Sequence, residues 1–186
     1  RDPKIWELNG KYYVAIGGES KDKCGKVVYY VSNDLYNYTY CGKLADSDGS
    51  LGNMWECPNF TRIENTDVLI FSPKGLENGF PASFESGYML GTMDYENKKF
   101  EHDAYRTLDY GFDFYAPQVM ECGTRKILFA WFAIPDSIGK EMKDGWRHLL
   151  TLPRELKVSS DHRLLMTPIK ELEKLRTKIL DTTLLN

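Results

Sequence analysis

One pattern recurs three times in this 186-residue chain: a proline, an apolar side chain two residues later, a polar turn and an apolar run. The copies start at Asp2-Pro3, Glu56-Cys57-Pro58 and Tyr115-Ala116-Pro117, and their apolar runs cover 12–16, 68–71 and 127–131. The period of roughly 55 to 60 residues leaves room for about four strands in each copy. The chain is therefore predicted to build three similar four-stranded units.

The strand character of these units follows from short apolar runs between turn signals. Asn9-Gly10 precedes one such run and is a strong signal for a tight hairpin. Further runs cover 27–31 and 88–91, and helical periodicity is almost absent before the last twenty residues. The predicted fold class is all-β, as part of a β-propeller with about three blades, and a plain antiparallel sandwich is the alternative.

Blade boundaries follow from the repeat. Residues 1–166 form the predicted partial propeller, with blades starting near 1, 56 and 113. Three blades do not close a ring, and closure is what removes exposed sheet edges. Either further blades are missing from this chain, which its start inside a motif favours, or it self-associates through open blade edges.

The last segment, 167–186, differs in pattern. Thr167 is a predicted N-cap with Pro168 at the first helical position. An apolar stripe follows at Ile169, Leu172, Leu175 and Ile179. We expect a short helix that packs on the last blade or leads toward another domain.

Composition excludes several function classes. The net charge of −3 leaves no basic footprint for nucleic acid, and no run of about 18 apolar residues could span a membrane. The four cysteines contain no CxxC pair and the three histidines show no ligand spacing, so neither a metal nor another cofactor is expected. A Cys24–Cys41 disulfide is conceivable, but reduced thiols in a cytoplasmic protein are the simpler interpretation.

Glu56 stands in a crowded setting, between Trp55 and Cys57 and close to Pro58. Poor hydration favours the protonated carboxyl, and such a group can act as a general acid. The alternative is an ordinary polar residue at the start of a strand. In a propeller, the first strand of each blade lines the central channel, so Asp2, Glu56 and Tyr115 are predicted to converge at one channel mouth.

Carboxylates and aromatic rings around a channel mouth suit a carbohydrate. Glycoside cleavage needs one carboxylic acid to protonate the leaving oxygen and a second carboxylate as nucleophile or base. Glu56 fits the acid, whereas Arg1 favours the ionised form of Asp2 and suits it to holding hydroxyl groups. Aromatic side chains that could form the walls, or equally the blade core, are Trp55, Phe114, Tyr115, Trp131 and Trp146.

Four ordered motifs resemble those of glycoside hydrolase family 32. They are Arg1-Asp2-Pro3, Trp55-Glu56-Cys57-Pro58, the stretch 109–118 (DYGFDFYAPQ) and the stretch 150–156 (LTLPREL). The resemblance implies a five-bladed propeller, usually followed by a β-sandwich, and retaining hydrolysis of β-fructofuranosides.

The resemblance also implies site roles. Glu56 matches the acid/base, and Asp2 the transition-state stabiliser with Arg1 beside it. Substrate-binding positions would be Arg1, Cys57, Asp113, Tyr115 and Trp131.

The departure from the family pattern concerns the nucleophile, an aspartate in an Asn-Asp-Pro-Asn-Gly motif that this sequence lacks. The chain is therefore expected to be a fragment from the C-terminal part of the propeller, inactive alone, that acts in its complete form on sucrose, sucrose 6-phosphate or fructan. A non-catalytic propeller that binds glycan or protein, and a fructosyltransferase, are the alternatives. A phosphorylated substrate would need basic residues near the mouth, for which Lys74, Arg125, Lys140 and Lys143 are available.

Overall fold

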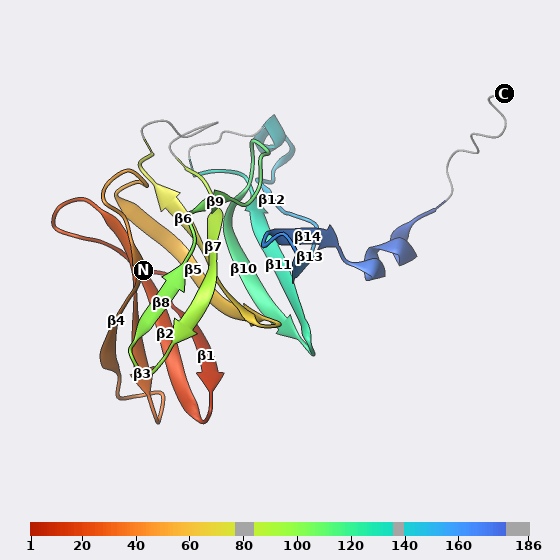
Figure 1. Cartoon of the computed structure of the whole chain (residues 1–186). Coiled ribbons are helices and arrows are strands. Elements are labelled where there is room, and N and C mark those ends of the chain that lie inside the picture. Colours follow the sequence, from red (N-terminus) through yellow and green to blue (C-terminus); the bar gives the residue numbers. More distant parts are fainter. Residues whose placement is uncertain (77–83, 136–139, 178–186) are drawn as a thin grey trace.

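The computed structural model describes residues 1–76, 84–135 and 140–177, which form three antiparallel sheets in succession along the chain (Figure 1). The first sheet contains β1 (Lys4–Leu8), β2 (Lys11–Glu19), β3 (Gly25–Ser32) and β4 (Thr39–Asp46). The second contains β5 (Met54–Ile63), β6 (Thr66–Lys74), β7 (Gly87–Asp94), β8 (Lys99–His102) and β9 (Arg106–Thr107). The third contains β10 (Tyr115–Cys122), β11 (Arg125–Phe132), β12 (Leu149–Leu150), β13 (Arg154–Val158) and β14 (Leu164–Pro168).

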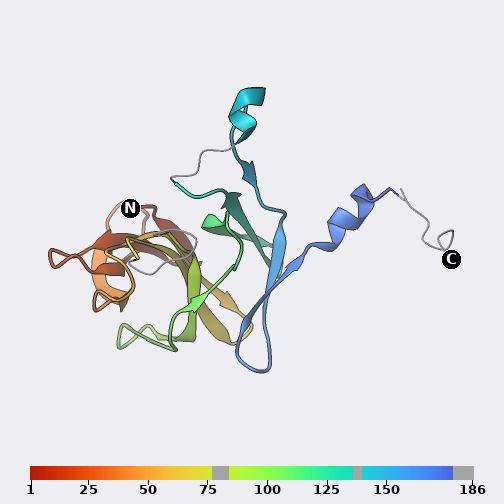
Figure 2. The ribbon, with the colours of Figure 1, turned by 90° about the horizontal axis from the view of Figure 1, so that it is seen from above.

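Each sheet is an up-and-down meander. Its main strands pair in sequence order, and the short β9 and β12 pair with β7 and β11. Seen from above, the sheets follow one another like the sectors of a fan (Figure 2). The all-β class and the threefold repeat are therefore confirmed, each sheet has four main strands, and the inner strands are β1, β5 and β10.

Tight turns join the first two strands of each sheet. Leu8 pairs with Lys11 across Asn9-Gly10, whose φ angles of 52° and 72° are those of a type I′ turn. Glu64, with φ of 54°, begins the corresponding turn between β5 and β6. This left-handed backbone matches the right-handed twist of the strands and sets the register between the first two strands of the sheet.

The core lies between the sheets as two clusters of buried side chains. One joins the first and second sheets, and the other joins the second and third. Trp55 belongs to the first cluster: it is fully buried, stacks on Phe71 at 4.1 Å between ring centroids, and donates from Nε1 to the Leu51 carbonyl at 2.7 Å. Trp55 is thus a core residue and forms no wall of the mouth.

The C-terminal segment departs from its prediction. Thr167 and Pro168 are the last residues of β14, where Thr167 pairs with Glu155, so neither begins a helix. A 3-10 helix, η2, covers Lys170–Leu175 and buries no residue. Ile179 lies outside the described residues. The ladder pairing with β13 overrides the local Thr-Pro signal and moves the helix start to Lys170.

One other short element completes the fold. A 3-10 helix, η1 (Lys140–Asp144), precedes β12, and Arg125 of β11 pairs with Glu171 of η2 at 2.6 Å. No helix in the described part of the chain has the length and apolar character needed to cross a bilayer.

The approach of β2 to β5 leaves no space for a side chain at Gly17. A Cβ there would lie 2.1 Å from the Trp55 carbonyl oxygen, whereas one at Gly18 would meet only the Lys26 side chain at 3.9 Å. We expect Gly17→Ala to lower the free energy of unfolding by about 1–3 kcal/mol through overpacking. Urea denaturation measures this, with Gly18→Ala as the matched control, and equal losses in the two variants would contradict the close approach.

Candidate functional site

The same irregularity interrupts the inner strand of every sheet. In β5 the pairing shifts between Glu56, opposite Ser72, and Asn59, opposite Ile70. The extra residue in the inner strand is a β-bulge, and bulges re-aim side chains.

The other two sheets carry the equivalent bulge. In β10 the shift falls between Tyr115 and Gln118. Ahead of β1, Arg1 and Gly17 exchange backbone hydrogen bonds, whereas Lys4 pairs with Ala15, which is again a slip of one residue. The repeat seen in the sequence is thus a repeated bulge.

A left-handed residue stands immediately before the proline in each bulge. Asp2, Cys57 and Ala116 have φ angles of 58°, 50° and 51°. Residues with a Cβ rarely adopt this conformation, and a following proline further favours extended backbone. Each such residue costs about 1–3 kcal/mol, which the surrounding contacts must offset.

Alignment on the prolines corrects the predicted equivalence of Asp2 with Glu56 and Tyr115. The position two before the proline holds Arg1, Glu56 and Tyr115, and the position one before it holds Asp2, Cys57 and Ala116. Asp2 is therefore the equivalent of Cys57. The predicted alignment was wrong by one residue because it matched polar side chains instead of the proline.

Glu56 is the centre of the resulting cluster. Its side chain is buried, the Tyr115 hydroxyl donates to Oε2 at 2.8 Å, and Arg1 Nη1 lies 3.0 Å from Oε1. The two partners come from the first and third sheets, so three inner strands meet at this carboxylate.

Asp2 joins the same cluster through two neighbours. Arg1 Nε lies 3.3 Å from Asp2 Oδ2, and the Cys57 backbone N–H donates to that oxygen at 3.1 Å. Arg1 thus bridges both carboxylates, while a bulge amide of the second sheet holds Asp2. The structure brings Arg1, Asp2, Glu56, Cys57 and Tyr115 together.

The electrostatics of these groups have clear causes. Glu56 and then Asp2 raise the pKa of Arg1, which keeps its positive charge. Burial, followed by the bond to Glu56, raises the pKa of Tyr115, so this phenol remains a donor. Burial and the charge of Asp2 raise the pKa of Cys57 to about 12, so its thiol stays protonated.

Two predicted site residues lie apart from this cluster. Asp113 is half-buried in the segment that leads into β10, and no ion pair or hydrogen bond joins it to another described residue of the cluster. Trp131 lies 5.0 Å from the His148 ring and lines a hollow with Lys4, Gln118 and Leu150. The substrate-binding roles of Asp113 and Trp131 stay predictions.

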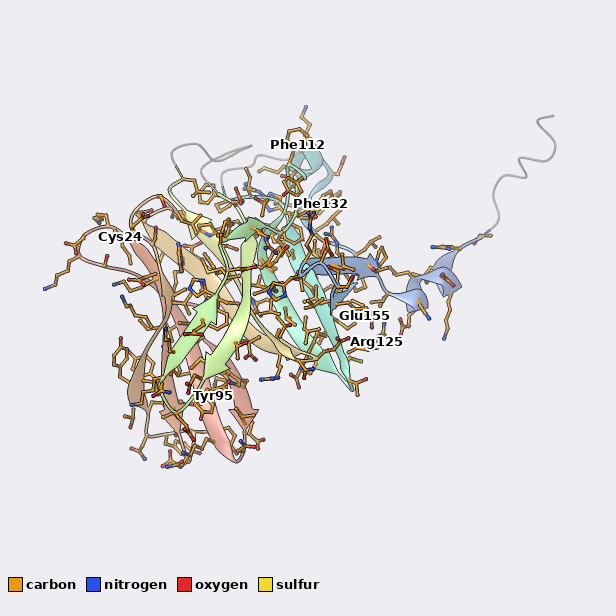
Figure 3. All side chains as sticks on the ribbon, in the orientation of Figure 1. Cys24, Tyr95, Phe112, Arg125, Phe132 and Glu155 are labelled. Atoms are coloured by element: carbon orange, nitrogen blue, oxygen red, sulfur yellow. The ribbon has the colours of Figure 1, made fainter. Side chains whose placement is uncertain are left out.

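The basic residues considered for a phosphate group also separate in space. Lys74 ends β6 opposite Met54, at the Glu56 end of the second sheet, and its ammonium lies 5.8 Å from the Phe84 ring centroid. Arg125 pairs with Glu155 at the opposite end of the third sheet, far from Phe112 and Phe132 (Figure 3). Lys143 lies exposed in η1, and the side chain of Lys140 falls outside the described residues.

Sequence reasoning missed Asn59, which is fully buried beneath the bulge. Its amide donates to the carbonyls of Pro117 at 2.8 Å and Cys57 at 3.1 Å, and its Oδ1 accepts from Val119 N–H at 2.9 Å. The sequence did contain a signal for this residue. Asn59 follows Pro58 directly, and the same place in the other two copies also holds a polar side chain, Lys4 and Gln118.

Residues 1–168 match the family model described as "Glycosyl hydrolases family 32 N-terminal domain". The chain belongs to glycoside hydrolase family 32. The match covers all three sheets, and it accords with the motifs that suggested the family.

Similar proteins include the sucrose-6-phosphate hydrolases of Staphylococcus xylosus (39% identity) and Bacillus subtilis (38%), each aligned over 95% of this chain. Among solved structures, a Bombyx mori GH32 β-fructofuranosidase superimposes on 95% of the chain with a TM-score of 0.90 at 38% identity. A mutant of that enzyme was solved in complex with sucrose. The chain spans only 36% and 39% of the two hydrolases and 39% of the Bombyx structure, and its three sheets match part of the five-bladed propeller of this family.

The half-buried thiol of Cys57 gives a test of the site's electrostatics. Because the thiolate is the reactive form, we expect iodoacetamide at pH 8 to modify Cys57 far more slowly than the exposed Cys122. Asp2→Asn removes a charge that raises the Cys57 pKa, so it should accelerate labelling of Cys57 and leave Cys122 unchanged. Peptide mass spectrometry reads both rates, and faster labelling of Cys57 than of Cys122 in the unmodified protein would contradict the assignment.

Proposed function

We propose that this chain is the acid/base-bearing part of a retaining β-fructofuranosidase that hydrolyses sucrose, sucrose 6-phosphate or a fructan. The observation that supports this most strongly is the Glu56 carboxylate at the meeting point of three inner strands, where Tyr115 and Arg1 contact it. Family membership supports the reaction class, and the contacts around Glu56 support the roles proposed for the individual residues.

Glu56 would donate a proton to the glycosidic oxygen as the bond to fructose breaks, and would then take a proton from the attacking water. The Tyr115 hydroxyl and the Arg1 guanidinium fix the direction of its carboxylate. Asp2 would accept hydrogen bonds from fructosyl hydroxyl groups, since its orientation is set by Arg1 and by the Cys57 amide.

Retention requires a second carboxylate that attacks the anomeric carbon. The 186 residues contain no Asn-Asp-Pro-Asn-Gly motif to carry it. We therefore propose that the nucleophile belongs to a part of the propeller outside this chain, and that the chain alone does not turn over fructosides.

The names of the relatives bear on the choice of substrate. The two hydrolases cited above are named for sucrose 6-phosphate, which favours a phosphorylated or free sucrose over a long fructan. Of the considered basic residues whose side chains are described, Lys74 lies at the Glu56 end of its sheet. A cytoplasmic location would suit a phosphorylated sugar and stays a prediction.

Replacing the acid tests the proposal. In the complete gene product, Glu56→Gln should lower kcat on sucrose or sucrose 6-phosphate by about 10²- to 10⁴-fold, because a general acid contributes that much. Glu64→Gln, at the turn that ends β5, removes an exposed carboxylate and is the matched control. Circular dichroism shows that the fold is kept. Wild-type kcat in Glu56→Gln would refute the acid role, and complete protein inert on sucrose, sucrose 6-phosphate and fructans would refute the function.

The fructosyltransferase alternative uses the same residues and differs in the acceptor. Analysis of products at high sucrose separates the two reactions, because transfer yields oligosaccharides and hydrolysis yields free fructose. A non-catalytic binding propeller would show neither product in the complete protein.

Self-association of the isolated chain remains a further proposal. The outer sheets expose apolar side chains, among them Ile5 and Tyr40 in the first and Met120, Phe132 and Leu150 in the third. We expect sedimentation equilibrium of the 186-residue chain to show oligomers at micromolar concentration, and Leu150→Glu to weaken them. A chain that stays monomeric would contradict this expectation.

A further inference from the structure

The peptide units at Val119, in the inner strand of the third sheet, are held by side chains from both other sheets. Asn59 of β5 accepts a hydrogen bond from the Val119 N–H at 2.9 Å. The Lys4 ammonium of β1 donates to the Val119 carbonyl oxygen. Lys4 and Asn59 are named the Val119 clamp below.

The clamp residues occupy the same place in the repeat, directly after the bulge proline. Lys4 follows Pro3 and Asn59 follows Pro58, and Gln118 holds that place in the third copy, next to Val119 itself. Lys4 and Asn59 therefore lie three residues after Arg1 and Glu56, on the other side of the bulge proline. The clamp ties together the strands whose bulges carry Arg1, Glu56 and Tyr115.

Asn59 makes the most direct connection. Its amide nitrogen donates to the Cys57 carbonyl inside its own bulge and to the Pro117 carbonyl inside the neighbouring one. One fully buried side chain thus joins two left-handed bulge segments. Because a buried amide without partners is costly, these bonds fix the relative position of the bulges.

Lys4, the first residue of β1, makes the other contact with Val119. Burial lowers the pKa of its half-buried ammonium, while the charge of Glu121 acts against that shift. Its bond crosses from the first sheet to the third, where Glu121 pairs with Lys126 and lines the same hollow as Lys4. Lys4 thereby sets the spacing between the strand of Arg1 and the strand of Tyr115.

We propose that Lys4 and Asn59 are positioning residues that hold the Tyr115 hydroxyl and the Arg1 guanidinium against the Glu56 carboxylate. The consequence for catalysis rests on the proposed function, whereas the clamp itself does not. A displacement of about 1 Å at a reacting group can cost about 10²-fold in rate, so loss of the clamp would act on kcat.

The first test needs no catalysis. Since Asn59 holds the Cys57 carbonyl, Asn59→Ala in the complete gene product should accelerate iodoacetamide labelling of Cys57 by about tenfold or more, with Cys122 as internal reference. Ser32→Ala is the matched control: Ser32 is a buried polar side chain with three hydrogen bonds, at the far end of the first sheet. Equal labelling of Cys57 in the two variants would overturn the clamp.

The second test separates positioning from stability. Asn59→Ala and Lys4→Met should lower kcat by about 10- to 100-fold with KM changed less than about threefold. Ser32→Ala, which also removes buried hydrogen bonds, and Lys126→Met, which removes a neighbouring charge, should leave kcat within about twofold. Lys4→Arg should keep most of the wild-type rate. If Asn59→Ala does not fold, the kcat and KM of Lys4→Met provide the test.

The outcomes are distinct. Faster labelling of Cys57 with unchanged kcat, or equal loss of kcat in the control variants, would overturn the positioning role. Faster labelling in a complete protein that hydrolyses no fructoside would support the clamp and overturn the proposed function instead.

Discussion

The site depends on one backbone feature, a left-handed residue immediately before a proline in each inner strand. Asp2, Cys57 and Ala116 all adopt it, although both the Cβ and the proline disfavour it. The bulge places a long side chain two residues before the proline, where Arg1, Glu56 and Tyr115 meet. Without the bulge the strands would alternate regularly, and successive residues such as Glu56 and Cys57 would point to opposite faces.

The cost of three strained residues is offset by bonds between sheets. Asp2 accepts from the Cys57 amide, and Asn59 links the bulges of the second and third sheets. Neighbouring blades therefore stabilise one another at the same place where they assemble the cluster. The same contacts thus stabilise the sheets and assemble the candidate site at this end, while the far end carries ion pairs such as that of Arg125 with Glu155 (Figure 3).

Much of the fold could be predicted because its signals are local. Asn9-Gly10 formed the expected tight hairpin, and the apolar runs became strands because alternation and β-branched residues suit a half-buried sheet. The predicted helix start at Thr167-Pro168 was wrong, because pairing with β13 extends strand β14 through both residues. Trp55 was proposed as a wall or core residue, and only the packing of Gly17, Gly25 and Phe71 around it decided for the core.

The site itself was predictable in part. Residue types and their order singled out a set of five residues that the structure brings together, because carboxylates near aromatic rings indicate sugar chemistry and the motifs resemble one family: Arg1, Asp2, Glu56, Cys57 and Tyr115. The equivalence of Asp2 with Glu56 failed by one residue, and Asn59 was overlooked. Both errors concern contacts between strands more than 50 residues apart, which no local pattern specifies.

By itself, the sequence determined the strand-rich class, the threefold repeat and the family, because turn residues, alternation and motifs are properties of neighbouring residues. Tertiary structure alone decided which side chains share the Glu56 carboxylate, that Trp55 is buried, and that Lys4 and Asn59 hold Val119. The physical reason is that these features depend on the bulge register of three separate strands. That register is set by hydrogen bonds and packing between sheets and only becomes defined when the sheets come together.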